Sequence, residues 1–354
     1  MRAERAGVGE RVSVARKAFV STLVAVAVVV SALALWRLKV VIALLFLAVT
    51  ISAAMRPGVE WLAARRVPRP IGLLLNYVLL LGLVALFLSL VVPHLITQVE
   101  SAISSTKGHH ATGIKGQILT AIQRRLRHLP SAGKLVHPAL SIGKTAFEVL
   151  IGIFFTFASA AYWLFERDRA IDLVASLVER PRRKKLRDTW LLIDLKLGAF
   201  VRGELILIVL VATVASLAFW AVGEPYFLLI GIAAGILEIV PVIGPLVAIA
   251  LAAGAGLTSS WRIALYAAIA LLAIRLLEDY LVTPRVLGGA VGLSPLVVLI
   301  SVTTTGILLG GFYVLIAVPL ASLLATLIDV AVRGHDPSEA ETPTVLFPAK
   351  DSDT

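Results

Sequence analysis

The chain has 354 residues, of which 59% are hydrophobic and 16% are charged, and its mean hydropathy is +0.94. Soluble globular domains carry about 25% charged residues, so this composition excludes that class and indicates a polytopic membrane protein. The formal net charge of +11 comes from short basic segments between apolar runs, which favours the lipid bilayer rather than nucleic acid as the partner.

Apolar runs in chain order predict an all-α membrane domain over residues 18–331. A single crossing needs roughly 20 apolar residues, and two tracts, 226–257 and 295–331, are longer than that. With the single spans, they give about eight helical membrane elements. The single spans are predicted near 18–36, 40–55, 70–93, 141–165, 203–222 and 263–282.

Basic residues predict the orientation. The tail 1–17, the loop 56–69 and the segment 166–202 are each rich in Lys and Arg, and all three lie on one side if every span crosses once. An excess of Lys and Arg marks the cytoplasmic side. We therefore expect cytoplasmic N- and C-termini and an extracytoplasmic segment at 94–140.

Two of the predicted cytoplasmic segments differ in character. Residues 182–198 place Leu186, Trp190 and Leu197 at helical spacing behind a basic cluster, which fits either a helix on the membrane surface or a solvated linker helix. The end of the chain, 332–354, combines prolines with acidic residues and is expected to be a disordered tail.

Both long tracts contain residues that interrupt helices. In the first, Pro241 and Pro245 remove backbone donors and Gly244 permits a tight reversal, so we predict a re-entrant hairpin. In the second, breaks at 303–306 and at 310–311 predict another hairpin or a strongly broken helix pair. Broken helices at membrane depth persist only inside protein or beside a cavity, which indicates a transport site.

Each tract follows one full span, 203–222 or 263–282. The first of these spans runs outward and the second inward on the predicted orientation, so the two units have opposite topology. Secondary transporters with inverted repeats have this arrangement and bind substrate where the broken helices meet.

Charged residues inside the apolar sequence are candidates for the transport path. Arg275, Glu278 and Asp279 share one span, and Glu238 precedes the first break by three residues. An unpaired charge in hydrocarbon costs a few kcal/mol, so such groups pair or line water. The carboxylates of Glu238 and Glu278 fit proton or cation coupling, whereas a helix-end ion pair and a capping group are the structural alternatives.

The hydroxyl groups of the second tract complete the candidate path. They could bind an alkali cation or a polyol, or they could bond back to their own helix. The candidate path residues are Glu238, Pro241, Gly244, Pro245, Arg275, Glu278, Asp279, Thr303, Thr304, Thr305 and Gly306.

Motifs of catalysis and cofactor binding are missing from the sequence. It has no cysteine, no Walker sequence, no Gly-x-Ser-x-Gly and no His-Glu-x-x-His. We therefore expect no enzyme activity, no cofactor and no metal centre.

Six motifs occur in a fixed order along the chain. They are Tyr162–Arg169, Phe200–Glu204, Pro241–Pro245, Glu278 with Pro284, Gly292–Leu296 and Gly310–Pro319. This ordered set resembles the autoinducer-2 exporter family of bacterial inner-membrane transporters, across residues 20–330. The resemblance implies multi-pass insertion in the inner membrane, oligomers and export of the quorum-sensing furanone signal. Some members are similar to exchangers of sodium or lithium for protons.

Three positions depart from the family pattern. Glu204 stands where glutamine is usual, Val242 where an aromatic residue is common, and Asp279 where a small or amide residue is frequent. These departures leave the expected fold unchanged and leave the substrate open.

The sequence as a whole predicts a secondary transporter that moves a small polar solute or a monovalent cation by alternating access. Proton- or cation-coupled export of a solute such as the autoinducer-2 signal is the first hypothesis, and a sodium(lithium)/proton antiporter is the second. A membrane scaffold without transport activity and a channel are the remaining alternatives.

Overall fold

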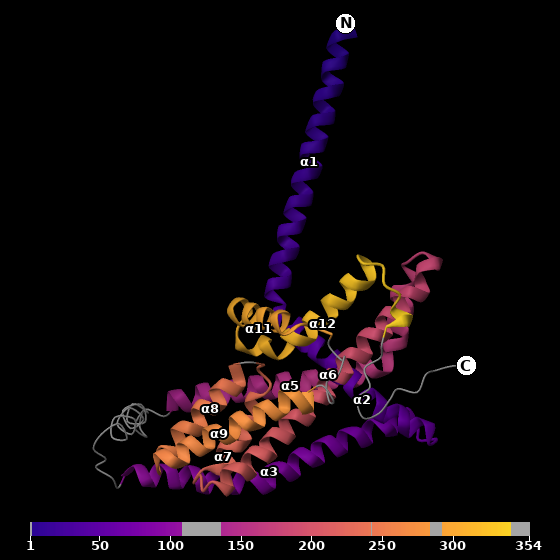
Figure 1. Cartoon of the computed structure of the whole chain (residues 1–354). Helices are drawn as coiled ribbons and strands as arrows, with labels where there is room; N and C mark the ends of the chain where they lie inside the picture. The colour runs from indigo at the N-terminus through magenta and orange to yellow at the C-terminus, as the bar shows by residue number, and fades with distance from the viewer. Residues whose placement is uncertain (1, 108–135, 242, 284–291, 341–354) are drawn as a thin grey trace. The chain divides into compact units, whose positions relative to one another are not determined.

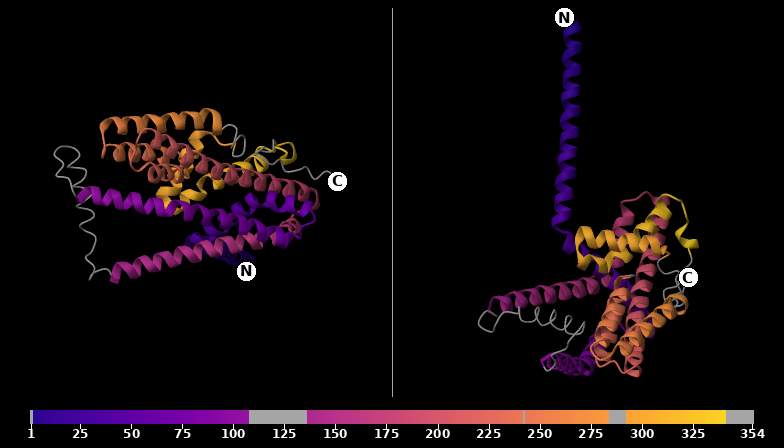
Figure 2. Two further views of the ribbon diagram at one scale, coloured as in Figure 1. Left: turned by 90° about the horizontal axis from the view of Figure 1, so that it is seen from below. Right: turned by 60° about the vertical axis from the view of Figure 1, so that its left-hand side comes forward.

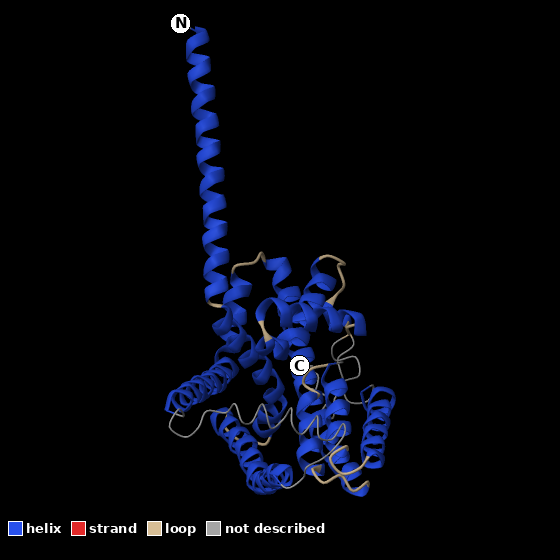
Figure 3. Cartoon of the chain, turned by 90° about the vertical axis from the view of Figure 1, so that its left-hand side faces the viewer, coloured by secondary structure: helices blue, strands red, loops and turns tan. Residues whose placement is uncertain are grey.

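A computed structural model describes residues 2–107, 136–241, 243–283 and 292–340. Across those ranges the backbone forms helices and short connections, without a strand (Figure 3). The predicted all-α class is therefore confirmed. The chain divides into two compact units, residues 1–46 and 47–354, which are described separately.

The first unit contains α1 (Arg2–Arg37), a single unbroken helix (Figure 1), and the start of α2 (Lys39–Ala64). From Phe19 onward α1 exposes large apolar side chains on all sides, including Leu23 and Leu33. A helix that is apolar all round belongs in a buried or membrane environment, as the sequence predicts for the first span.

The helices of the second unit follow in chain order after α2. They are α3 (Arg69–Lys107), α5 (Val136–Ser176), α6 (Arg180–Ala221), α7 (Phe227–Leu237), α8 (Ile243–Gly256), α9 (Trp261–Leu277), the π-helical turn η2 (Glu278–Val282), α11 (Pro295–Leu309), the 3₁₀ turn η3 (Gly311–Tyr313), α12 (Val314–Ala331) and the 3₁₀ turn η4 (Pro337–Glu339). Ser260 and Ser294 cap the starts of α9 and α11 by accepting backbone N–H bonds at 3.2 and 3.4 Å.

Among the described helices, five are long and apolar enough to cross a membrane. They lie within Phe19–Arg37, Lys39–Ala64, Phe147–Ser176, Arg180–Ala221 and Gly311–Ala331. The shorter apolar helices include α7, α8 and α11. Long spans combined with apolar helices too short to cross alone confirm a polytopic membrane protein with broken membrane elements.

Helices α6 to α9 form a bundle that positions the candidate site, and α7, α8 and α9 lie side by side in Figure 1. Its core contains Phe219 of α6, Ala234 of α7, Ala252 of α8 and Ala267 of α9. Small residues let these helices approach closely, as expected for packing within a membrane. A Cβ atom at Gly231 of α7 would lie only 2.6 Å from the backbone nitrogen of Ser216 in α6.

The second hairpin consists of α11 and α12 and packs on α6. Its core residues Val302, Ala317 and Val318 contact Phe200 of α6 and Val240, which follows α7. The loop between α7 and α8 therefore packs against the second hairpin, although the two hairpins lie far apart in the sequence.

Only one of the two breaks predicted for this hairpin is present. Helix α11 runs without interruption through residues 303–306 and ends at Leu309, so the break predicted at 303–306 is wrong. The break predicted at 310–311 is confirmed, and Gly310 there has a φ of 109°, which is accessible mainly to glycine. The three threonines lower helix propensity only slightly, which does not end a helix inside an apolar run.

Two predicted boundaries also fall inside continuous helices. Helix α6 joins the amphipathic segment 182–198 to the span 203–222. Helix α3 continues beyond residue 93, where the predicted span ends, to Lys107 with Pro93 inside it. Composition changes at both places, but the backbone does not break.

Helices α3 and α5 contact each other near the start of α3 and the middle of α5. The Tyr77 hydroxyl donates to the Phe157 carbonyl at 2.8 Å, and the two rings meet edge to face. In Figure 2, α3 and α5 lie close together at one end and diverge towards the other. The part of the segment 94–140 that joins them, 108–135, lies outside the described residues.

After α12 the chain folds back along α6. The turn η4 contacts α6, and Pro337 in this turn is buried. The Ser338 hydroxyl and backbone N–H both donate to Asp336, at 2.7 and 2.9 Å, and these bonds lower the pKa of the Asp336 carboxyl. The described chain thus continues to Ala340, beyond the boundary at 332 that we predicted for the tail.

Candidate functional site

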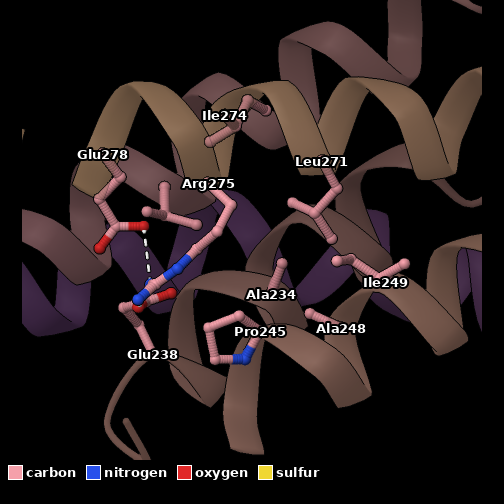
Figure 4. A pocket seen from close by; sticks show the side chains of 10 residues that line it. Ala234, Glu238, Pro245, Ala248, Ile249, Leu271, Ile274, Arg275 and Glu278 are labelled. Atoms are coloured by element: carbon pink, nitrogen blue, oxygen red, sulfur yellow. Dashed lines mark hydrogen bonds and ion pairs between the residues drawn. The ribbon is translucent and has the colours of Figure 1, made fainter. Parts of the chain in front are cut away.

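The bundle brings four charged residues together where α7 ends and α9 passes into its π-helical turn, and three of them, Glu238, Arg275 and Glu278, are drawn in Figure 4. Arg275 donates to Glu238 at 2.6 Å and to Glu278 at 3.2 Å, and it pairs with Asp279 at 2.8 Å. In Figure 4 its side chain extends from α9 between the carboxylates of Glu238 and Glu278. We refer to Arg275, Glu238, Glu278 and Asp279 as the Arg275 cluster.

Local structure explains how these groups meet. Glu238 directly follows the last residue of α7, so its side chain leaves the helix end rather than a helix face. Glu278 and Asp279 begin the π-helical turn η2, in which each turn holds more residues than an α-turn. Single π-helical turns are frequent at functional sites.

The Arg275 cluster is buried to different degrees. Glu238 and Glu278 are 7% and 4% exposed as whole residues, whereas the side chain of Asp279 is 44% exposed. One guanidinium therefore meets two buried carboxylates and one half-exposed carboxylate. If all four groups are ionised, three negative charges and one positive charge leave a net charge of −2.

A fourth carboxylate lies within electrostatic range on another helix. Glu204 of α6 interacts with both Glu278 and Arg275. Sequence reasoning left Glu204 out of the transport path because it stands near the start of a predicted span. The packing of α6 against α9 brings it to the cluster, and its departure from the usual glutamine was the signal that could have identified it.

A small cavity adjoins the Arg275 cluster. Its apolar lining comes from all four helices and includes Val211, Ala234, Ala248 and Leu271, while Glu238, Pro245, Arg275 and Glu278 also line it. Its free volume of about 10 Å³ holds about one water molecule. The cavity as it stands therefore fits a water molecule or a small cation and would have to widen for an organic solute.

Of the predicted residues of the first hairpin, Pro245 lines this cavity, while Pro241 lies in the turn after α7 and Gly244 in the first turn of α8. The backbone N–H of Gly244 donates to Val240 at 2.8 Å, and that of Ile243 donates to Pro241 at 2.8 Å, which closes the loop between α7 and α8. At Gly244 a side chain would overlap the carbonyl of Leu237, so only glycine fits there. Val242 lies outside the described residues.

The predicted residues of the second tract are not part of the cavity. Thr303 and Thr304 are exposed on α11, and Thr305 and Gly306 are partly exposed. None of the four lines the cavity at Arg275. The structure thus brings together Glu238, Pro245, Arg275, Glu278 and Asp279, and it places the threonines elsewhere.

Arg202 has a structural role that the sequence did not indicate. Pro57 inside α2 has no N–H to give the carbonyl of Ala53, four residues earlier. The Arg202 guanidinium donates to that carbonyl at 3.5 Å and to Ala54 at 3.3 Å. Arg202 therefore replaces a hydrogen-bond donor that Pro57 removes and ties α6 to α2.

The fold and the buried charged site define a multi-pass helical membrane protein of the transporter type. A family model described as AI-2E family transporter matches residues 23–333. The chain belongs to this family, which confirms the resemblance found in the sequence.

Relatives whose names describe them as transport proteins support this assignment. YrrI of Bacillus subtilis (strain 168) is 25% identical over 311 residues, covering 81% of this chain and 85% of YrrI. MT0215 of Mycobacterium tuberculosis (strain CDC 1551 / Oshkosh) is 26% identical over 314 residues, covering 84% of this chain and 85% of that protein. Both likenesses cover more than four-fifths of this chain.

Proposed function

We propose that this protein is a secondary transporter that couples the movement of a small polar solute to a proton or a monovalent cation at the Arg275 cluster. The observation that carries the proposal is the charge balance. Glu238, Glu278 and Asp279 share the single guanidinium of Arg275, and Glu204 acts on the same groups.

Because Glu238 and Glu278 are buried, this charge imbalance favours binding of a proton or a small cation. Buried like charges cannot all remain ionised without a compensating positive charge. A proton on one carboxyl, or a small cation between two of them, supplies that charge. Exchange of the proton for the cation at these carboxyls couples the flux of protons to the flux of cations.

The same observation favours a second candidate, exchange of sodium or lithium for protons. Carboxylate oxygens suit hard cations, and the present cavity has room for about one water-sized particle. For the first candidate, the solute follows from the family, and the autoinducer-2 signal is the proposed cargo of export. An inner-membrane location and an oligomeric assembly belong to the same proposal.

The test is a proton-gradient assay in everted membrane vesicles. Sodium or lithium added to vesicles with the wild-type protein should collapse the gradient, and Glu278→Gln should abolish this collapse. Asp172→Asn is the matched control, because it neutralises an exposed carboxylate that pairs with Arg187 outside the cluster. Collapse by autoinducer-2 but not by the cations would select solute export. No collapse with any of the three, with the protein present in the membrane, would contradict the coupling.

A further inference from the structure

A second buried acid lies outside the Arg275 cluster, in the turn between α6 and α7. Glu224 is 2% exposed, and its side chain is among the largest that are fully buried in the described part of the chain. Its turn is closed by its own backbone N–H, which donates to Phe219 at 2.9 Å, and Gly223 before it has a φ of 77°. The turn therefore directs this carboxyl into the protein.

The carboxyl of Glu224 lies against the turn between α8 and α9. A Cβ atom built on Gly256, the last residue of α8, would lie 2.9 Å from a carboxyl oxygen of Glu224 and 2.6 Å from the backbone nitrogen of Ala264 in α9. Glu224 thus occupies the junction of two helix turns, with no room for a larger residue at Gly256. We refer to this contact as the turn junction.

Neither carboxyl oxygen of Glu224 has a hydrogen-bond partner within the described part of the chain. The backbone N–H of Tyr226 favours the ionised form electrostatically, but its geometry is not that of a hydrogen bond. An ionised carboxylate that is buried without partners costs several kcal/mol. A carboxyl in this position is stable when it carries a proton.

The helices described next to Glu224 supply no basic side chain that pairs with it. Helix α6 beyond Glu204, helix α7 and helix α8 contain no titratable side chain. Arg262 in the first turn of α9 is exposed, and α3, which packs on α7, carries His94. Burial is the dominant influence and raises the pKa of the Glu224 carboxyl from 4.5 to about 7.

We propose that Glu224 is a proton-binding site separate from the Arg275 cluster, and that loss of its proton loosens the turn junction. The two sites bracket α7, whose 11 residues span about 16 Å. The ligand is a proton: an O–H bond forms on the carboxylate and neutralises its charge. When that proton leaves, a charge without partners remains between the two turns and favours their separation.

The proposal fixes the direction of the pH dependence. The folded state holds the Glu224 proton more tightly than the unfolded state, so the stability that this proton contributes is complete below pH 4.5 and is lost as the pH rises to about 7. Glutamine at this position resembles the protonated acid and does not titrate.

The experiment measures the thermal unfolding midpoint of the detergent-solubilised full chain between pH 5 and pH 8. The midpoint of Glu224→Gln should be close to that of the wild type at pH 5 and higher at pH 8, with the difference growing as the pH rises to about 7. Glu339→Gln, at an exposed position, should follow the wild type throughout. Parallel curves for Glu224→Gln and the wild type would overturn the proposal.

Infrared titration provides a second measurement that does not depend on the glutamine variant. The wild type should show the carbonyl stretch of a protonated carboxyl that disappears near pH 7, and Glu224→Asp should keep a band but shift its midpoint. A wild-type spectrum without a protonated carboxyl titrating near neutrality would overturn the proposal even if Glu224→Gln does not fold.

Discussion

At the scale of single residues, the Arg275 guanidinium is the centre of the site because three carboxylates depend on it. Glu238 and Glu278 are buried and would lose their counterion if it were removed, whereas Asp279 reaches solvent. Replacing Arg275 should therefore destabilise the protein more than replacing any one of the three carboxylates.

Replacement of Arg275 tests this dependence. Arg275→Gln should lower the free energy of unfolding by about 3–5 kcal/mol, because it leaves buried carboxylates uncompensated. Asp279→Asn should cost less than about 1 kcal/mol, since a half-exposed pair contributes little. Chemical denaturation in detergent measures both, and equal losses for the two variants would contradict the assigned burial.

The pair of Arg202 and Pro57 gives a second prediction at this scale. Arg202→Ala should destabilise the protein by about 1–3 kcal/mol, because the carbonyl of Ala53 loses a charged donor. In a Pro57→Ala background the loss should be smaller, since residue 57 then supplies an N–H to that carbonyl. A double-mutant cycle from unfolding midpoints measures the coupling, and additive effects of the two changes would exclude this role of Arg202.

At the scale of helices, close contacts at glycine hold the bundle together. Gly231→Ala should destabilise the protein by about 1–3 kcal/mol, because its Cβ atom would meet the Oγ of Ser216 in α6 and also the backbone nitrogen of Ser216 at 2.6 Å, which cannot turn aside as a side chain can. Gly254→Ala in α8 is the matched control, since nothing lies within 4 Å of its Cβ position. It should stabilise the helix by up to about 1 kcal/mol. The thermal unfolding midpoints of Gly231→Ala and Gly254→Ala measure these effects. A shift of the same sign in both variants would contradict the close contact at Gly231.

The position of the break in the second hairpin is also a property of its helices. Gly310→Ala should cost about 1–2 kcal/mol and slow transport, because an L-residue is strained at a φ of 109°. Thr304→Val keeps the shape of an exposed side chain on continuous α11 and should leave both properties unchanged. Loss of transport in Thr304→Val with an intact fold would return residues 303–306 to the transport path.

Sequence reasoning located the helices better than their breaks. Pro241 and Pro245 identified the first break because proline removes backbone donors. In the second tract, both the threonines and Gly310 were candidates, and local propensity did not separate them because only the backbone angle at Gly310 requires glycine. Arg275, Glu278 and Asp279 were identified from their spacing in one span. The surroundings of Glu204 and Glu224 could not be predicted in this way, because they are formed by contacts between helices that are distant in the sequence.

At the scale of the whole molecule, the described helices from α6 onward form two successive groups, each with one helix followed by a pair of helices. Helix α6 precedes α7 and α8, and α9 precedes α11 and α12. The Arg275 cluster lies where the first pair meets α9, and Val240 of that pair touches the core of the second. A shift of either pair relative to α9 would therefore change the contacts of Arg275, as alternating access requires.

The most direct test of coupling at the Arg275 cluster uses purified protein in liposomes, with an imposed pH gradient as the only source of energy. Sodium, lithium or autoinducer-2 is added, and the decay of the gradient is compared for the wild type, Glu278→Gln and Asp172→Asn. The proposed mechanism predicts faster decay with at least one of these additions for the wild type and Asp172→Asn, and none for Glu278→Gln. Equal decay in Glu278→Gln and the wild type would contradict a coupling role for the cluster.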